Sequence, residues 1–189
     1  MAHEDKIKWD NKYLNNANLL EKRPPSKILK EYISNAPSNN ALDLACGSGR
    51  NSIFLAQNGF SVDSIDISTI ALDHLKNLSA NLDINPLLAD LDSFTPDKSY
   101  DLILMINFLD RELIKRTKEW LNKDAIFIVE TYMRDKANQK QNSNPDFLLK
   151  SGELKEIFKE FDIIEYREFY NEPHELYRMK KSSIVAKRL

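Results

Sequence analysis

The sequence predicts an α/β fold built on a doubly wound, mostly parallel sheet of seven strands, of which the last runs antiparallel. Short apolar runs alternate along the chain with segments whose apolar residues recur at helical spacing. One of these runs, 41–45, leads directly into a turn with two glycines and then into a helical segment. Another, 100–106, is apolar apart from Asp101, which is typical of a central parallel strand covered on both faces.

These patterns place the individual elements in order. Strands are expected at 41–45, 60–66, 84–89, 100–106, 125–131, 162–169 and 182–186. Helices are expected at about 25–35, at 53–58 with Asn51 or Ser52 as the N-cap, at 68–78 with Ser68 as the N-cap, at 109–121, and from a Ser151 cap to 161. Residues 11–22 are polar and predict a loop. Residues 171–181 contain no helical pattern, so the last two strands are expected to form a hairpin.

Length and composition bound the organisation of the chain. Its 189 residues, 42% hydrophobic and 30% charged, predict one globular domain, 1–189, with a core of its own. Residues 1–23 precede the helix predicted at about 25–35 and are interpreted as an N-terminal cap segment. The polar stretch 132–148 is interpreted as a lid-like loop, because compact domains rarely keep connections beyond ~12–15 residues that bind nothing.

Charge and cysteine content exclude several classes of function. A formal charge of −2 provides no broad basic field for a phosphate backbone, so no nucleic-acid partner is expected. One cysteine predicts neither an intramolecular disulfide nor a zinc cluster, and we expect no bound metal. No apolar run approaches the ~20 residues that span a bilayer, and the charged start lacks a signal core. A cytoplasmic location without a membrane partner is therefore expected, and the oligomeric state stays open.

The glycine turn is the predicted ligand site. Gly47 and Gly49 allow the backbone to turn tightly and a ligand to approach the main chain. Asp43 lies inside the strand that feeds the turn, where a carboxylate is costly unless something bonded or positive meets it. Asp66 ends the second strand, where dinucleotide folds place the acid that holds ribose hydroxyls, and Asp90 follows the third strand in the same way.

The acids decide which ligand fits this turn. A pyrophosphate cofactor requires a full glycine fingerprint, yet the third glycine position is Ser52 and Asp43 lies nearby. This pattern disfavours an NAD-dependent dehydrogenase and favours a cationic ligand. S-adenosylmethionine has a sulfonium, an amino group, a ribose and an adenine, and no phosphate.

The residues that carry these signals resemble a known family. The stretch 43–50, followed by Asp66-Ile67-Ser68 and Asp90-Leu91, is similar to the class I S-adenosylmethionine-dependent methyltransferases. Residues 107–111, 144–149 and 152–154 resemble a narrower group of small bacterial enzymes that includes the tellurite-resistance methyltransferases. The resemblance covers nearly the whole chain, and it implies a Rossmann-like seven-stranded fold and S-adenosyl-L-methionine as the cofactor.

The resemblance also implies roles for individual residues at the cofactor. Asp43 is expected at the methionine end, Asp66 at the ribose hydroxyls, and Asp90 with Leu91 at the adenine. The aromatic residues of the N-terminal segment, Trp9 and Tyr13, are expected to cover the cofactor, although they could equally pack a first helix on the sheet. Asp90 could instead form a turn beside Asp92. The full set of expected cofactor-binding residues is Trp9, Tyr13, Asp43, Ala45, Gly47, Gly49, Asp66, Ile67, Asp90, Leu91 and Asn107.

The acceptor side is less defined, and no catalytic residue is assigned. The candidates are Tyr132, Arg134, His174 and Arg178, which follow strand ends on the predicted ligand edge. Arg111 is interpreted as a helix-surface or structural ion pair rather than as a catalytic group. The proposed partner is a small-molecule methyl acceptor, either a thiol or a chalcogen oxyanion such as tellurite.

Two alternatives to this function stay open at the sequence level. One is a cofactor-binding regulatory module without turnover. The other is a methyltransferase that acts on a macromolecule. Amino-methylating enzymes of that kind commonly carry an Asn/Asp-Pro-Pro-aromatic sequence after the fourth strand, whereas residues 107–110 here read Asn-Phe-Leu-Asp, without the prolines.

Overall fold

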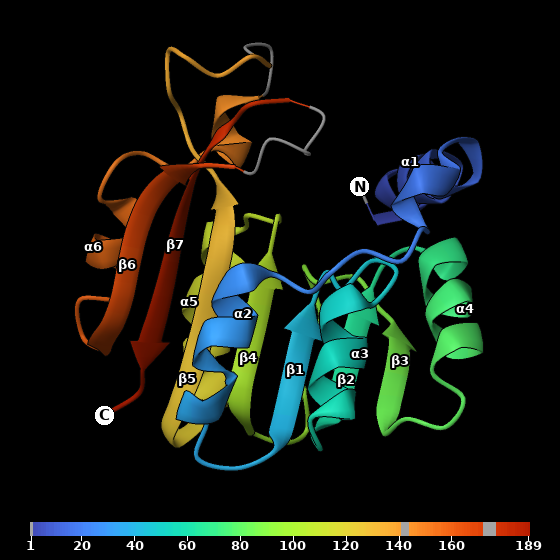
Figure 1. Cartoon of the computed structure of the whole chain (residues 1–189), viewed down its shortest axis with the longest axis horizontal. Helices are drawn as coiled ribbons and strands as arrows, with labels where there is room; N and C mark the ends of the chain where they lie inside the picture. Colours follow the sequence, from blue (N-terminus) through green and yellow to red (C-terminus); the bar gives the residue numbers. More distant parts are fainter. Residues whose placement is uncertain (1, 141–143, 172–176) are drawn as a thin grey trace.

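A single sheet of seven strands forms the centre of the computed structural model, which describes residues 2–140, 144–171 and 177–189 (Figure 1). The strand order is β3-β2-β1-β4-β5-β7-β6. Neighbouring strands are parallel except that β7 is antiparallel to both β5 and β6. The strands are β1 (Asn40–Leu44), β2 (Ser61–Asp66), β3 (Ile84–Leu88), β4 (Tyr100–Ile106), β5 (Leu121–Tyr132), β6 (Asp162–Tyr170) and β7 (Lys180–Lys187). The predicted fold class, with its antiparallel last strand, is confirmed.

The helices of the described residues are mostly shorter than the sequence pattern predicts. They are α1 (Ala2–Asn15), α2 (Lys27–Tyr32), α3 (Arg50–Gln57), α4 (Thr69–Leu78), α5 (Arg111–Thr117) and α6 (Glu153–Ile157). Single 3-10 turns at 33–35 and 118–120 extend α2 and α5. The helix predicted from residue 109 begins only at Arg111, because Asp110 is its N-cap and its carboxylate accepts hydrogen bonds from the amides of Glu112 and Leu113.

The N-terminal segment is more helical than predicted. Residues 11–15 belong to α1, so the expectation of a loop from residue 11 is wrong as far as Asn15. The polar sequence conceals this helix, because its stabilising contacts are tertiary: Tyr13 is buried, and Asp10 accepts a hydrogen bond from Ser68 Oγ.

Long-range partners explain which predicted caps form. The Ser68 cap of α4 is confirmed, since its Oγ accepts from the Ala71 amide. Neither Asn51 nor Ser52 caps α3, whose N-cap is Gly49 with φ of 79°. The side chain of Asn51 instead accepts from the Ser26 amide, and the Ser52 hydroxyl donates to Asp43.

The predicted Ser151 cap of α6 is also wrong. Gly152 occupies the N-cap position with φ of 75°, and the Ser151 hydroxyl donates to Glu168 of β6 at 2.8 Å. In each case the side chain has a partner outside its own helix, which local sequence cannot reveal.

Two hydrophobic cores cover the two faces of the sheet. We call the face packed by α2 and α3 the α3 face, and the face packed by α5 and α6 the α5 face. Strand β5 shows the alternation that separates them, with Ile126 and Ile128 on the α3 face and Phe127 and Val129 on the α5 face.

The strand order places a crevice at one edge of the sheet. Strands β2 and β3 follow β1 in one direction and β5 follows β4 in the other, so the order reverses between β1 and β4. Ligands of open α/β sheets bind beyond the carboxyl ends of the strands at such a reversal. Among the described residues, no helix combines the length and apolar character needed to cross a membrane.

The junction between the glycine turn and α4 generates a stability prediction. A Cβ on Gly49 would lie 2.2 Å from Cδ1 of the fully buried Leu75, whereas a Cβ on Gly59, with φ of 86°, would meet nothing within 4 Å. Both Gly→Ala changes force a residue with a Cβ into a left-handed backbone conformation, which costs about 1–2 kcal/mol of stability. We expect Gly49→Ala to lose about 1–3 kcal/mol more than the control Gly59→Ala in urea unfolding, because Leu75 must repack. Equal losses of stability in the two variants would show that Leu75 accommodates a Cβ on residue 49 without repacking.

Candidate functional site

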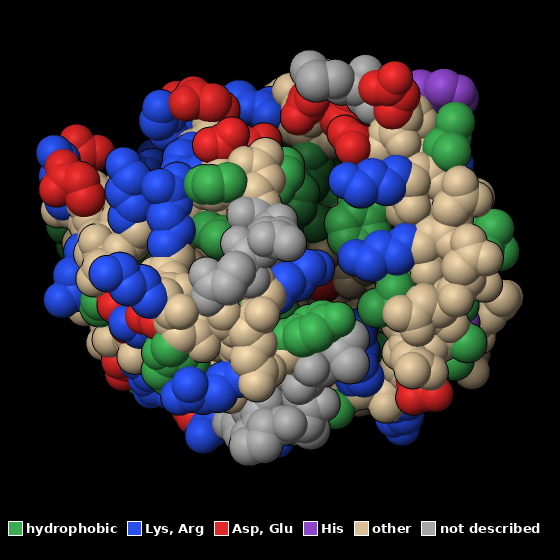
Figure 2. All heavy atoms as spheres, turned by 90° about the horizontal axis from the view of Figure 1, so that it is seen from above, with side chains coloured by type: hydrophobic (Ala, Val, Ile, Leu, Met, Phe, Trp, Pro, Cys, Tyr) green, Lys and Arg blue, Asp and Glu red, His purple; other side chains and the backbone are tan. Residues whose placement is uncertain are grey.

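The glycine turn lies at the carboxyl edge of β1 and has a left-handed backbone at three positions. Ala45, Gly47 and Gly49 have φ of 54°, 56° and 79°. A non-glycine residue in this region stores conformational strain, which proteins keep mainly at functional sites. Figure 2 views this edge and shows a hollow with hydrophobic side chains within it and charged side chains around it.

Asp43 is a buried carboxylate directly below the turn. Its side chain is 1% exposed, and its Oδ2 accepts a hydrogen bond from Ser52 Oγ at 2.6 Å. Burial raises the pKa of Asp43 to about 7, although the Ser52 hydrogen bond opposes this shift. A cationic ligand near this group would relieve the cost of burying its charge.

Asp66 ties the end of β2 to the turn. Its Oδ2 accepts from the Gly47 amide at 2.7 Å and its Oδ1 from the Ser68 amide at 2.9 Å. Burial raises the pKa of Asp66, and these backbone hydrogen bonds act in the opposite direction. A carboxylate has about four acceptor positions, so Asp66 can still accept from ligand hydroxyls. The neighbouring Ile67 is half-buried.

Helix α1 places Tyr13 against the glycine turn. Tyr13 is 8% exposed, and its hydroxyl oxygen lies 2.7 Å from the position that a Cβ on Gly47 would occupy. The half-buried Trp9 lies one turn earlier, with its ring centroid 6.2 Å from that of Tyr13. Both aromatic residues therefore lie at the predicted edge, and whether they cover a cofactor stays a prediction.

Asp10 is the residue of this region that sequence reasoning missed. Its Oδ1 accepts from Ser68 Oγ at 2.7 Å and from the Ile70 amide at 3.3 Å, which fixes α1 to the start of α4. In the sequence, Asp10 is only an acid that could meet the N-terminus of some helix. Because 58 residues separate it from Ser68, local sequence does not show which helix it meets.

The expected adenine contacts lie after β3. Asp90 Oδ1 accepts from the Asp92 amide at 3.0 Å, so Asp90 forms the turn that the alternative interpretation describes. Leu91 is buried, and its carbonyl accepts from Arg116 at 2.6 Å. The assignment of Asp90 and Leu91 to a ligand stays a prediction.

Asn107 follows β4 at the reversal of strand order. It is exposed, its φ is 59°, and its amide donates to the Glu130 carbonyl at 2.7 Å. This position suits the expected contact with the methionine end of the cofactor.

The acceptor candidates are spread around the other half of the edge. Tyr132 ends β5 and is half-buried. The exposed Arg134 donates to the Pro145 carbonyl at 2.9 Å, and the exposed Arg178 lies 3.7 Å from the ring centroid of Tyr170. His174 lies outside the described residues. No catalytic role follows from these contacts.

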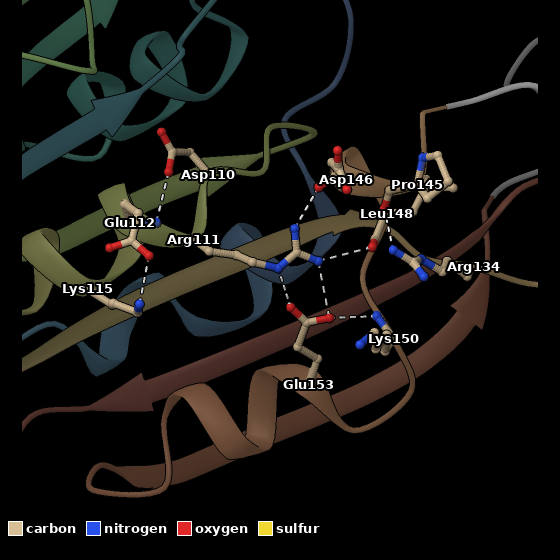
Figure 3. Close-up of polar contacts among 10 residues, drawn as sticks. All are labelled: Asp110, Arg111, Glu112, Lys115, Arg134, Pro145, Asp146, Leu148, Lys150 and Glu153. Atoms are coloured by element: carbon tan, nitrogen blue, oxygen red, sulfur yellow. Dashed lines mark hydrogen bonds and ion pairs between the residues drawn. The ribbon is translucent and has the colours of Figure 1, made fainter.

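Arg111 is a structural ion pair, as predicted (Figure 3). Its guanidinium makes two hydrogen bonds with the Glu153 carboxylate, at 2.5 and 3.2 Å. It also donates to the carbonyls of Asp146 and Leu148, which fixes residues 146–148 between α5 and α6. Burial opposes ionisation of Glu153, but the Arg111 guanidinium holds the pKa of this carboxyl below its usual value.

A separate cavity lies at the opposite edge of the sheet. It measures about 270 Å³ and is lined by Lys118, Glu119, Glu160, Phe161, Arg188 and Leu189. Asp43, Asp66 and the glycine turn lie at the other edge of the sheet, so this cavity is not the ligand site that the sequence predicts. Within the described ranges, no group of three or more His, Cys, Asp or Glu residues is arranged to hold a metal ion.

Comparison with known proteins identifies similar sequences. The family model described as tellurite resistance protein TehB matches residues 9–182. A probable S-adenosyl-L-methionine-dependent methyltransferase TehB from Haemophilus influenzae is 29% identical over 163 residues, which cover 78% of this chain. The chain spans 56% of the length of that relative.

Solved structures agree with the fold. TehB from Haemophilus influenzae has a TM-score of 0.78 at 26% identity, covering 87% of this chain and 62% of the other. The magnesium protoporphyrin IX methyltransferase of Synechocystis, solved with bound S-adenosylhomocysteine, has a TM-score of 0.72 at 14% identity and covers 100% and 99% of the two chains. The second likeness shows the fold alone.

The burial of Asp43 predicts that the free energy of unfolding depends on pH. An unfolded Asp releases its proton near pH 3.8, whereas folded Asp43 holds it to about pH 7, so its contribution to the free energy of unfolding falls as pH rises across this window. We expect the stability of Asp43→Asn relative to the native protein to increase from pH 4 to 7 and then level off in chemical unfolding.

Asp63 is the matched control for this measurement. Burial opposes its ionisation, yet its pKa is lowered by Lys98, Asn85 and Tyr100. Asp63→Asn should therefore be less stable than the native protein by a constant amount from about pH 5 upward. If the stability difference from the native protein followed the same pH profile in both variants, the raised pKa of Asp43 would be wrong.

The Arg111 contacts predict a stability effect without a binding effect. We expect Arg111→Ala to lower the free energy of unfolding by about 2–3 kcal/mol, since it removes the cation beside a partly buried Glu153 and the side-chain donor to two carbonyls. Arg167→Ala, which removes an exposed ion pair with Glu31 and Glu165, should cost under about 1 kcal/mol. Affinity for S-adenosylhomocysteine, measured by calorimetry, should be unchanged in both; a loss confined to Arg111→Ala would place Arg111 in the binding site.

Proposed function

The chain belongs to the TehB family of tellurite resistance proteins, and on this premise we propose that it transfers a methyl group from S-adenosylmethionine to a small acceptor. The observation that carries the proposal is the Asp66 carboxylate at the glycine turn. The Gly47 amide, which would otherwise be available to a phosphate, donates to Asp66 instead. The edge is thereby suited to hydroxyl and ammonium groups rather than to a pyrophosphate.

Each part of S-adenosylmethionine has a counterpart among these residues. Asp66 would hold the ribose hydroxyls, with Ile67 beside it, and Asp90 with Leu91 would meet the adenine. The remaining residues would serve the methionine end and the cover of the cofactor: Asp43, Ala45, Gly47, Gly49 and Asn107 for the first, and Trp9 and Tyr13 for the second.

The chemistry requires alignment more than acid or base catalysis. Bound S-adenosylmethionine supplies an electrophilic methyl group, whose carbon gains a bond from the acceptor's lone pair as the bonding electron pair of the carbon–sulfur bond stays on sulfur. The chain's task is to hold the acceptor in line and to exclude water, and positioning alone can supply up to ~7–11 kcal/mol in favourable cases. A thiolate or a tellurite ion already has a free lone pair, so neither requires a general base.

We further propose that the acceptor lies on the β4–β5 side of the glycine turn. Residues 132–148 leave β5 at this edge, and Arg111 and Arg134 fix parts of this segment at 145–148. The described parts of this segment, 132–140 and 144–148, would close the acceptor site, with Arg178 beside them, since the Gln139 amide donates to the Arg178 carbonyl.

A turnover assay tests the proposed function. Purified protein with S-adenosylmethionine is given thiols, selenite, tellurite or small amines, and release of S-adenosylhomocysteine is measured. We expect turnover with a thiol or a chalcogen oxyanion. Binding of the cofactor without turnover for any acceptor would support a regulatory module instead, and turnover with amines alone would overturn the acceptor class.

Asp66 provides the residue-level test. Loss of a charged partner to a bound hydroxyl costs about 1.5–3 kcal/mol, so Asp66→Ala should weaken S-adenosylhomocysteine binding by about 10- to 150-fold in calorimetry. Asp73→Ala removes an exposed acid of α4 that pairs with Lys76, and it should bind like the native protein. The melting temperature of Asp66→Ala reports whether the lost Gly47 contact unfolds the chain; unchanged affinity would remove Asp66 from the site.

A further inference from the structure

A buried lysine lies at the same edge as the glycine turn. Lys181 is the second residue of β7, is 3% exposed and pairs with Tyr132 in the sheet register. Its Nζ lies 3.4 Å from Glu130 Oε1 and 4.9 Å from the ring centroid of Tyr132. We call Glu130, Tyr132 and Lys181 the Lys181 cluster.

Register places the Lys181 cluster level with the glycine turn. Glu130 pairs with Ile106 of β4, and Leu44 of β1 pairs with the preceding Met105, so Glu130 is level with the first residue after β1. The Glu130 carbonyl also accepts from the Asn107 amide. Two strand spacings separate β5 from β1, which is about 10 Å, and three separate β7, which carries Lys181, from β1, which is about 14 Å.

The cluster also shares a sheet face with Asp43. Alternation along β5 places Glu130 and Tyr132 on the α3 face with Ile126 and Ile128. On β1, Asp43 has the parity of Ala41, which belongs to the same core. The lysine and the buried acid therefore lie on one side of the sheet. Asp43 is level with Ile128 through Leu104, and Lys181 lies four residues further along, beyond the end of β1.

The ion pair between Lys181 and Glu130 is longer than a typical charge-assisted hydrogen bond. Charge-assisted hydrogen bonds are usually about 2.7–2.9 Å long, whereas Nζ and Oε1 of this pair are 3.4 Å apart. Apolar residues of similar volume often replace a buried pair without loss of stability. A buried ion pair is therefore weak evidence for a role in stability, which leaves the Lys181 ammonium group open to a role in binding.

We propose that Lys181 determines acceptor specificity by binding an anionic acceptor, a thiolate or a chalcogen oxyanion. The inference rests on the methyl transfer proposed above. Glu130 and Tyr132 lie beside the ammonium group when the acceptor site is empty, and the anion then replaces the Glu130 carboxylate beside Nζ. In a site that excludes water, a neighbouring cation keeps a thiol in its thiolate form.

Substitutions of the two charged residues of the cluster are expected to change anion affinity in opposite directions. Lys181→Met removes the cation and should weaken anion binding at least about tenfold, equivalent to about 1.4 kcal/mol. Glu130→Gln removes the competing carboxylate and keeps a hydrogen-bonding side chain, so anion binding should become several-fold tighter. A purely structural pair predicts the same direction of change in both variants.

The test is a calorimetric titration of the full chain, saturated with S-adenosylhomocysteine, with sodium tellurite and with thiophenolate. Lys187→Met is the control, because Lys187 is on the same strand and pairs with Asp124 at the opposite edge. It should bind both anions like the native protein. Affinity for S-adenosylhomocysteine should be native in all three variants.

Each outcome decides between the two levels of the proposal. A native protein that fails to bind S-adenosylhomocysteine overturns the proposed function. If it binds S-adenosylhomocysteine but neither anion, or if Lys181→Met keeps the native anion affinities, only the present inference falls. If Lys181→Met fails to fold, Glu130→Gln decides alone: tighter anion binding supports the role of Lys181, and unchanged or weaker binding overturns it.

Discussion

The Asp66 carboxylate joins the parts of the carboxyl edge into one unit. It accepts from the Gly47 amide on one side and from the Ser68 amide on the other, so the turn after β1 and the start of α4 are held to the end of β2. Ser68 continues the network through its hydroxyl, which donates to Asp10 of α1. The position of Tyr13 against Gly47 therefore depends on hydrogen bonds that begin at Asp66.

The edge carries a cost that the remainder of the fold offsets. Burial raises the pKa of both Asp43 and Asp66, which means that their ionised forms are destabilised in the folded protein. Ala45 and Asn107 add a left-handed backbone conformation directly after two neighbouring strands, β1 and β4. The two apolar cores on the two faces of the sheet support this edge from below, and the core of the α5 face extends to Ala45 and Leu91. Such a division of labour is expected where binding, rather than stability, selects the residues.

The two halves of the sheet carry different chemistry at this edge. The β1–β2 half presents the carboxylates of Asp43 and Asp66, which suit the cationic and hydroxyl groups of the proposed methyl donor. The β5–β7 half presents the Lys181 cluster, and the Arg111 and Glu153 pair holds the segment beyond it. In the function we propose, donor and acceptor thus meet at the reversal of strand order, between the carboxylates of Asp43 and Asp66 and the ammonium group of Lys181.

Sequence by itself determined the fold class, the antiparallel last strand, the glycine turn, the acid at the end of β2, the Ser68 cap and the ion-pair role of Arg111. These features rest on local patterns, namely periodicity, glycine spacing and the residue at a strand or helix end. Tertiary structure alone decided the length of α1, the loss of the Asn51, Ser52 and Ser151 caps, and the burial of Lys181. The reason is physical: each of these side chains, or the element that carries it, is held by partners from another element, such as Asp10 with Ser68 or Ser151 with Glu168, and no local pattern encodes a contact that exists only after the chain has folded.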